Sequence, residues 1–269
     1  MNHPYKLTLA FSSMGNRLLS LLPLIDKLKN CAQVEILVIV QEGTEQHKKS
    51  VENFSGIKFI WSGTIGLSRS RNLALETARG DYVWMLDDDV DIPIDHISLL
   101  LSEIDQHSLE ADIIRVRVGC TENPQELYKR YSKITDIRKL HLLKMNSIEL
   151  IVRRDFVQQS GVRFNQNIGL GTAFPGNEEA HFLIDAMDMG AKFLIIDRVY
   201  VYHSCCEGGR RKAESNAIME IRGATASRFS WLGIPLIVYW GSRYLLKEKR
   251  ISVVFSLLKG YCRGYKGYK

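Results

Sequence analysis

Short hydrophobic runs alternate with amphipathic stretches along most of the chain. The runs that are typical of β-strands occur near Leu7–Ser12, Val34–Val40, Lys58–Trp61, Tyr82–Leu86, Asp112–Val118, Ser147–Val152 and Phe193–Asp197. Between several of them, apolar residues recur at the spacing of one helix face. This alternation predicts an α/β protein with a largely parallel sheet.

Four helices are predicted from the same pattern. The first has its apolar face at Leu18, Leu21, Leu22, Ile25 and Leu28, and Pro23 is expected in its first turn, where a missing N–H costs little. The others are expected over Ser68–Arg79, around residues 97–104 and over Glu178–Met189. Asn177 is the predicted N-cap of the last helix.

The end of the chain has a different character. The 269 residues suffice for one large domain, residues 1–225, and residues 226–269 form long aromatic and basic stretches that we treat as a helical appendage. From Arg243 to Lys269 there are eight Lys or Arg and one Glu, a charge of +7, against +6 for the whole chain. Such a tail favours an anionic membrane surface as partner, and no nucleic acid is expected.

The cellular location is predicted from apolar segments and cysteines. The apolar stretch Leu7–Phe11 is too short for a secretory signal, and no segment reaches the roughly 20 apolar residues that span a bilayer. The five cysteines are odd in number and scattered, which favours a reducing compartment over a disulfide framework. We therefore expect a cytoplasmic protein, peripheral at the inner face of the cell membrane.

Three adjacent aspartates follow the predicted strand Tyr82–Leu86. Desolvating even one carboxylate costs several kcal/mol unless a partner compensates, and either a bound cation or solvent exposure would do so. In an extended chain Asp87 and Asp89 point the same way, at the strand end where open α/β sheets bind ligands. The triplet is therefore a candidate Mg²⁺ or Mn²⁺ site, with a solvated acidic loop as the alternative.

Two arginines lie at the start of the helix that leads into this strand. Arg69 and Arg71 oppose the helix dipole there, so they are poor choices for stability. They make sense if they meet an anion or one of the aspartates. A plain surface position is the alternative.

An acidic pair follows the glycine-rich segment Gly169–Gly176. Glu178 and Glu179 occupy the first turn of the predicted last helix. The helix dipole keeps a carboxylate ionised at neutral pH, as a general base for a hydroxyl proton requires. Ordinary pairing with the dipole explains the same positions equally well.

One histidine ends an apolar run just before a basic loop. His203 is a candidate third metal ligand, and Arg210 and Arg211 in that loop are candidates for contacting a diphosphate.

These motifs, in this order, resemble family-2 glycosyltransferases with the GT-A fold. The resemblance covers roughly residues 5–205 and rests on three motifs, which are Gly66 with Ser70-Arg71-Asn72, then Ala78-x-Gly80-Asp81-Tyr82, then Asp87-x-Asp89. Gly176-x-Glu178-Glu179 and His203 follow in the expected order.

The resemblance implies a Rossmann-like, mostly parallel sheet flanked by helices, and an inverting displacement. It implies a nucleotide-sugar donor, a divalent metal held by Asp89 with help from Asp87 and His203, and Glu179 as the base, with Glu178 beside it. Arg69, Arg71, Asp87 and Asp88 become donor-binding candidates.

The chain departs from the family in two regions that hold the nucleobase. Ala10-Phe11-Ser12-Ser13 replaces the usual Pro-Thr-Tyr-Asn, and Gln41-Glu42-Gly43-Thr44 replaces Asp-x-Gly-Ser. Ser12 and Glu42 are the candidates for these donor contacts, and a UDP-sugar is the favoured donor.

The sequence therefore predicts transfer of one sugar to a hydroxyl of a glycan acceptor, lipid-linked by hypothesis, in surface polysaccharide synthesis. Two alternatives stay open, a non-catalytic nucleotide-sugar-binding or assembly subunit and a sugar-nucleotide nucleotidyltransferase.

Overall fold

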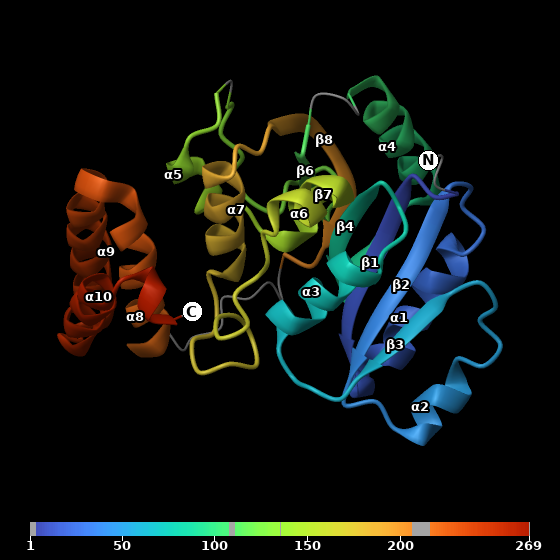
Figure 1. Ribbon diagram of the computed structural model, residues 1–269, viewed down its shortest axis with the longest axis horizontal. Coiled ribbons are helices and arrows are strands. Elements are labelled where there is room, and N and C mark those ends of the chain that lie inside the picture. The colour runs from blue at the N-terminus through green and yellow to red at the C-terminus, as the bar shows by residue number, and fades with distance from the viewer. Residues whose placement is uncertain (1–3, 108–110, 135, 206–215, 269) are drawn as a thin grey trace.

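The computed structural model of the chain describes residues 4–107, 111–134, 136–205 and 216–268. An eight-stranded sheet forms its centre, in the order β3–β2–β1–β4–β7–β6–β8–β5 (Figure 1). The strands are β1 (Leu7–Met14), β2 (Val34–Gln41), β3 (Lys58–Ser62), β4 (Tyr82–Asp87), β5 (Val90–Asp91), β6 (Ile113–Cys120), β7 (Leu150–Arg153) and β8 (Phe193–His203).

Most neighbouring strands run in parallel. β3, β2, β1 and β4 form a parallel block, and β6 is parallel to β8. β7 is antiparallel to both β4 and β6, and the short β5 is antiparallel to β8. The predicted α/β fold with a mostly parallel sheet is confirmed.

Helices cover both faces of this sheet. In β4, Tyr82, Trp84 and Leu86 pack on the side of α1 (Gly15–Leu28) and α4 (Ile94–His107), while Val83 and Met85 pack on the opposite side. This alternation is the period-2 pattern of a strand buried on both faces. The opposite side holds α3 (Leu67–Thr77), α6 (Arg154–Ser160) and α7 (Glu178–Asp188). The short α2 (Glu45–Ser50), α5 (Lys139–Leu142) and η1 (Ser147–Glu149) lie in the connections.

Three predictions about these elements are wrong. The strand expected over Ser147–Val152 begins only at Leu150, because Ser147–Glu149 form η1. Pro23 lies well inside α1, which already begins at Gly15. Pro23 and Leu19, four residues before it, both face solvent, where water can bind the carbonyl that loses its N–H partner. The last strand does not end at Asp197, because β6 and β5 pair with it as far as His203.

The C-terminal residues form a helical unit beside the sheet domain and pack against it through Phe229, Tyr265 and Tyr268 (Figure 1). It consists of α8 (Asn216–Ala226), η2 (Ser227–Leu232), α9 (Gly233–Glu248), α10 (Ser252–Arg263) and η3 (Tyr265–Tyr268). Its apolar core includes Met219 from α8, Ile237 from α9 and Leu257 from α10. A Cβ at Gly223 or Gly260 would collide with the backbone of the facing helix, so α8 and α10 pack very closely. The unit described in this way includes α8, and the domain boundary at residue 226 stays a prediction.

The cysteines behave differently from the prediction. Cys120, at the end of β6, forms a disulfide with Cys205, and their Cα atoms are 5.4 Å apart. The expectation against disulfides is wrong for this pair, because the β6–β8 register places Cys120 beside His203 and so brings Cys205 within reach. Cys31 and Cys262 are free.

No helix in the described part of the chain is both long and apolar enough to cross a membrane.

Candidate active site

A cavity of about 560 Å³ opens at the carboxyl ends of β1, β2 and β4. This is the edge at which open α/β sheets bind their ligands. The predicted residues that line it are Ser12, Asp87, Asp88, Asp89, Glu179 and His203. Ser13, Arg17, Gln41, Tyr128 and Ser147 also line it.

The aspartate triplet begins at the strand end but does not stay extended. Asp87 is the last residue of β4, and Asp88 and Asp89 form the turn before β5, so the expectation of a shared extended geometry is wrong. Asp88 is buried and accepts a hydrogen bond from Oγ of Ser13 at 2.7 Å. Nη2 of Arg17 lies 2.9 Å from Oδ1 of Asp88 and 3.0 Å from Oδ2 of Asp89. Burial nevertheless raises the pKa of Asp88 above its ordinary value.

The third aspartate meets the predicted histidine. The β5–β8 pairing places Val90 opposite His203, so the preceding Asp89 reaches the imidazole. Nε2 of His203 lies 3.2 Å from Oδ1 of Asp89, and Nδ1 lies 2.9 Å from the Ser204 carbonyl oxygen. The contact between the two side chains raises the pKa of His203 to about 8 and lowers that of Asp89 to about 2.

This pair has the donor atoms that Mn²⁺ or Mg²⁺ accepts, a carboxylate oxygen and an imidazole nitrogen. In neutral His203 a proton on Nδ1, donated to the Ser204 carbonyl, leaves the lone pair of Nε2 free for a cation. Asp89 and His203 are therefore the residues that could hold a metal here.

Asp87 is turned toward the other side of the cavity, where its Oδ1 lies 3.6 Å from Nη2 of Arg71. Within the described residues, the one group of three His, Cys or acidic side chains with ligand atoms within 4.8 Å of one another is Cys120, Glu122 and Cys205. Its two sulfurs form the disulfide. Asp87, which was also predicted as a metal ligand, thus does not form a ligand cluster with Asp89 and His203 in the structure.

Arg71 is a buried cation at the centre of an acidic group. Its Nη1 lies 3.2 Å from Oε1 of Glu178 and 3.1 Å from Oε1 of Glu179, and its Nη2 donates to Oγ of Ser147 at 2.7 Å. These carboxylates raise the pKa of Arg71 despite its burial, which acts in the opposite direction. The anionic partners of Arg71 therefore explain a cation near the N-terminus of α3.

The two glutamates of α7 have different surroundings. Glu178 is buried, and its Oε2 has no hydrogen-bond partner in the structure. Burial, reinforced by the charge of Glu179, raises the pKa of Glu178 to about 7. Glu179 is partly exposed and lines the cavity. Of the pair, Glu179 is the carboxylate that a bound molecule can reach.

The loop before α7 is clamped to α3. Asn72 donates to the Phe164 carbonyl and accepts from the Phe164 N–H, both at 2.8 Å, and the Leu67 N–H donates to the Leu170 carbonyl at 2.9 Å. Gly171 has a φ of +84°, and a Cβ there would lie 3.1 Å from Cα of Gly66. A glycine is therefore needed where this loop passes α3.

Asn177 lies at the N-cap position of α7, as predicted, but its side chain does not cap the helix. Asn177 has a φ of 66° and makes no capping bond. Its Nδ2 instead donates to Oγ1 of Thr225 in α8 at 3.0 Å, so it ties the start of α7 to the C-terminal unit.

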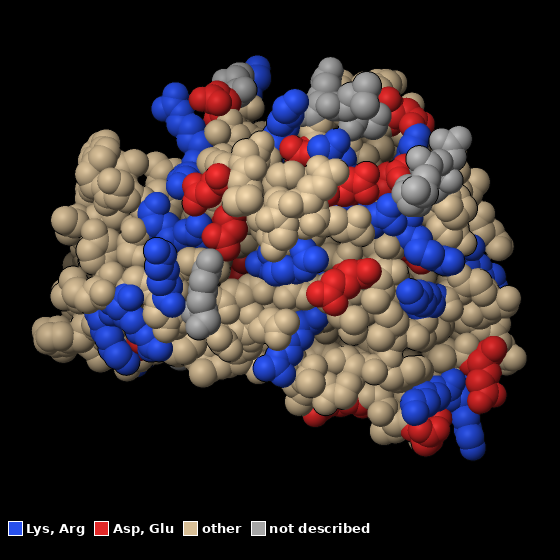
Figure 2. Space-filling view, viewed as in Figure 1, with Lys and Arg blue, Asp and Glu red and all other residues tan. Residues whose placement is uncertain are grey.

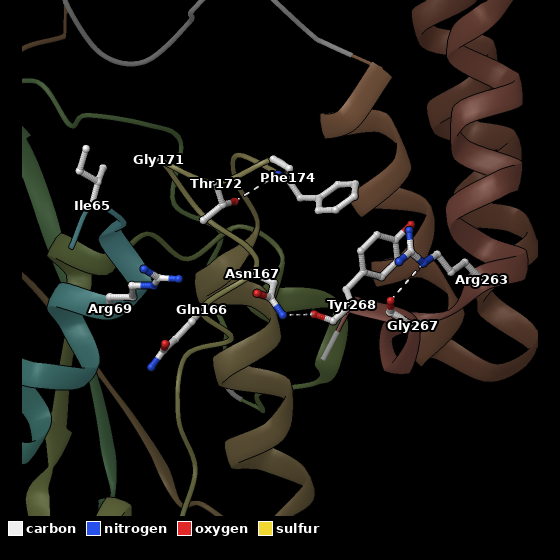
Figure 3. A pocket seen from close by; sticks show the side chains of 11 residues that line it. Ile65, Arg69, Gln166, Asn167, Gly171, Thr172, Phe174, Arg263, Gly267 and Tyr268 are labelled. Carbon is white, nitrogen blue, oxygen red and sulfur yellow. Dashed lines mark hydrogen bonds between the residues drawn. The ribbon is translucent and has the colours of Figure 1, made fainter.

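Other predicted residues lie outside this cavity. Glu42 is exposed, with a φ of 52°, whereas the neighbouring Gln41 lines the cavity and accepts the Gly66 N–H at 2.6 Å. Arg69 lines an adjacent cavity (Figure 3). Arg210 and Arg211 lie outside the described residues.

Sequence reasoning missed Arg17, Ser13 and Ser147. Arg17 had a usable signal, because it follows the first strand directly and so lies at the same sheet edge as the aspartates. Ser147 had none, since its place beside Arg71 depends on how η1 packs.

Residues 14–166, more than half of the chain, match the model of the family described as glycosyl transferase family 2. The chain belongs to glycosyl transferase family 2. The matched range includes Arg71 and the aspartate triplet, whereas Glu179 and His203 lie beyond it.

Solved structures of S. aureus TarS have the same fold class as this family 2 chain. It aligns with S. aureus TarS 1–349 at a TM-score of 0.61 and 17% identity, over 83% of this chain and 65% of that one. The TarS 1–349 complex with UDP-GlcNAc gives 0.61 and 18% over 83% and 66%, and the complex with UDP gives 0.57 and 19% over 83% and 65%. The chain thus spans less than two thirds of TarS 1–349 and 39% of the longer TarS chain. No curated protein matches its sequence.

Proposed function

We propose that this protein is an inverting glycosyltransferase that moves one sugar from a nucleotide-diphosphate sugar to a hydroxyl of a glycan acceptor. The observation that most directly supports this proposal is that Glu179 lines the same cavity as Asp89 and His203. A base and a site for the leaving group are both required for such a displacement.

The donor is proposed to lie with its diphosphate at the triplet and its nucleoside toward Ser12 and Gln41. The TarS complexes with UDP-GlcNAc and UDP support a UDP-sugar. When bound by Asp89 and His203, Mn²⁺ or Mg²⁺ would neutralise charge on the leaving diphosphate. Arg17 supplies a second positive charge beside the same carboxylates.

The displacement itself needs a deprotonated acceptor. The acceptor oxygen forms a bond to the anomeric carbon, the bond from that carbon to the diphosphate oxygen breaks, and the hydroxyl proton passes to Glu179. Nη1 of Arg71 lies 3.1 Å from Oε1 of Glu179 and so holds this carboxylate in place. The buried Glu178 contacts the same nitrogen. We assign Glu178 to positioning this pair.

The alternatives fit the cavity less well. A non-catalytic binding subunit would not need Glu179 to be held in the cavity by the buried Arg71. This arrangement also buries the charge of Glu178, which costs free energy of folding. A nucleotidyltransferase would use a glycine-rich phosphate loop after the first strand, but β1 passes directly into α1 at Gly15.

A thermal-shift screen tests the proposal. Nucleoside diphosphates are added singly, each with Mn²⁺ or with EDTA, and one base should stabilise the protein in a metal-dependent way. The matching sugar nucleotides are then assayed for diphosphate release. If no nucleotide stabilises the protein and none is consumed, the proposal is wrong.

The C-terminal helical unit is proposed to hold the enzyme at the inner face of the cell membrane, where a lipid-linked acceptor of surface polysaccharide synthesis would lie. Its helices expose large apolar residues, which include Trp231, Ile234, Val238, Leu246, Ile251 and Phe255. Val253 and Leu257 on the other side of α10 are buried in the unit's own core.

Figure 2 shows that the surface of the C-terminal helices consists mostly of uncharged residues, with a group of Lys and Arg beside them. Apolar side chains next to basic ones suit binding to anionic lipid.

A further inference from the structure

A second cavity, of about 430 Å³, lies next to the proposed active site. Figure 3 shows it between α3, the loop before α7 and the C-terminal segment. It shares Ile65 and Gly171 with the first cavity, so the two spaces adjoin. A molecule that fills the second cavity can therefore extend toward the first.

The two cavities differ in charge. The first is lined by three aspartates and Glu179, with Arg17 and His203 among them. The second is lined by Arg69 and Arg263 and, within the described residues, by no acidic side chain. An anion is therefore favoured in the second cavity by its local field.

The guanidinium groups of the two arginines, Arg263 and Arg69, differ in whether they have partners among the described residues. Nη1 of Arg263 lies 3.5 Å from Oε1 of Glu220, its Nε donates to the Gly267 carbonyl at 3.1 Å, and its guanidinium stacks over the Tyr268 ring at 4.3 Å. The guanidinium of Arg69 makes no ion pair or hydrogen bond with the described residues, and Figure 3 shows it extending from α3 toward the loop. Arg69 is therefore the cation that is available to a ligand.

The remaining lining suits a carbohydrate. Asn167 and Gln166 offer amide groups, and Asn167 is held by a bond from its Nδ2 to the Tyr268 carbonyl at 3.2 Å. Phe174 and Tyr268 form an edge-to-face pair, with ring centres 4.8 Å apart. Amides can bind sugar hydroxyls, and aromatic rings provide an apolar wall for a sugar ring.

We propose that the second cavity is the acceptor subsite and that Arg69 selects a glycan carrying an anionic group, a phosphate or a carboxylate. The inference rests on the proposed function, in which the acceptor hydroxyl must reach Glu179. The donor diphosphate is already served by Arg17 and the triplet in the first cavity. A planar guanidinium without a partner gains two charge-assisted hydrogen bonds from such a group.

The test measures binding of matched sugars to the full chain in the presence of UDP and Mn²⁺. Phenyl β-D-glucuronide and phenyl β-D-glucoside differ in one carboxylate, and glucose 6-phosphate and glucose differ in one phosphate. In the wild type, at least one acidic probe should bind about tenfold or more tightly than its neutral partner. Arg69→Gln should remove this preference, and Arg69→Lys should keep part of it.

Two controls make the result specific. Arg198→Gln, at an exposed arginine that pairs with Glu103 on another part of the surface, should leave every affinity unchanged. The affinity for UDP should be the same in wild type and Arg69→Gln. The proposal is overturned if acidic and neutral probes bind alike or not at all, or if Arg69→Gln weakens UDP instead. Failure of the wild type to bind UDP would refute the proposed function itself.

Discussion

Nη1 of Arg71 lies 3.1 Å from Oε1 of Glu179, and this contact joins the start of α3 to the first turn of α7. Glu178 contacts the same nitrogen at 3.2 Å, so one buried guanidinium holds two carboxylates. Only Glu179 of the pair reaches the cavity, which is the geometric reason to assign it as the base.

Glu179→Gln removes the proposed base without changing the shape of the side chain. Turnover should fall by roughly 10²–10⁴-fold, as is typical when a general base is lost, while donor binding is retained. Glu178→Gln should cost less, because it leaves the cavity carboxylate in place. The measurement is diphosphate release at saturating donor. If Glu178→Gln costs more than Glu179→Gln, the two roles are reversed.

Arg71→Met should strongly destabilise the protein. Removing one partner of a buried ionic group leaves the other charges uncompensated, at a cost of about 3–5 kcal/mol in the free energy of unfolding. Urea denaturation measures this loss. Adding Glu178→Gln to Arg71→Met should restore part of the lost free energy of unfolding, because the unpaired buried carboxylate of Glu178 is then removed.

The matched control for Arg71→Met is Arg198→Met, at an exposed ion pair, which should cost less than about 1 kcal/mol. Equal losses at the two arginines would show that the buried network does not stabilise the fold.

The pH dependence of stability should show the buried carboxyl of Glu178. In the folded protein its pKa is about 7, against an ordinary value of 4.5. Between these values the folded state binds more protons than the unfolded chain, so Glu178 makes the free energy of unfolding fall as the pH rises.

Glu178→Gln removes this titration. Its melting temperature relative to wild type should therefore increase between pH 5 and pH 8, and a difference that stays constant would contradict the assignment.

The apolar side of the C-terminal unit should be needed for membrane binding. Leu246 and Phe255 are 81% and 66% exposed, so replacing both by Glu should leave the fold intact. Burying each such side chain is worth about 1.5–3 kcal/mol, so the double variant should lose more than tenfold in affinity for anionic vesicles. Co-sedimentation measures the affinity, which should also fall with added salt in the wild type. Unchanged sedimentation of the double variant would refute the membrane proposal.

The centre of the sheet could be predicted closely because strands such as β1, β2 and β4 are buried on both faces. Continuous apolar runs such as Val34–Val40 have few other structures open to them, and the strand ends then place Asp87 at the correct edge. What the pattern could not show was β5, which has two residues and exists because β8 pairs with it. That pairing is what brings Asp89 to His203.

The site was predictable where a residue type conflicted with its local position. Arg71 opposes the dipole of α3, and that conflict pointed correctly to an anionic partner. Ser147 and the Cys120–Cys205 bond produce no such conflict, because their partners are distant in sequence and depend on tertiary packing. Arg17 does oppose the dipole of α1, but this conflict was hidden because the helix was expected to begin near Pro23 and not at Gly15. Arg69 was grouped with Arg71 by sequence, whereas two positions along a helix differ by about 200° in direction, so Arg69 lies in the neighbouring cavity.

The central claim is that a divalent cation held by Asp89 and His203 strengthens binding of the nucleotide donor in this cavity. Calorimetric titration of UDP with Mn²⁺ or with EDTA, on wild type and on Asp89→Asn, Asp88→Asn and Asp91→Asn, tests it most directly. Asp91 pairs with Lys27 outside the cavity and is the control. We predict that Mn²⁺ strengthens UDP binding in wild type and Asp91→Asn, that Asp88→Asn keeps most of this gain, and that Asp89→Asn loses it. Equal UDP affinity with Mn²⁺ and with EDTA in the wild type, or an Mn²⁺ gain that survives Asp89→Asn, would contradict the account.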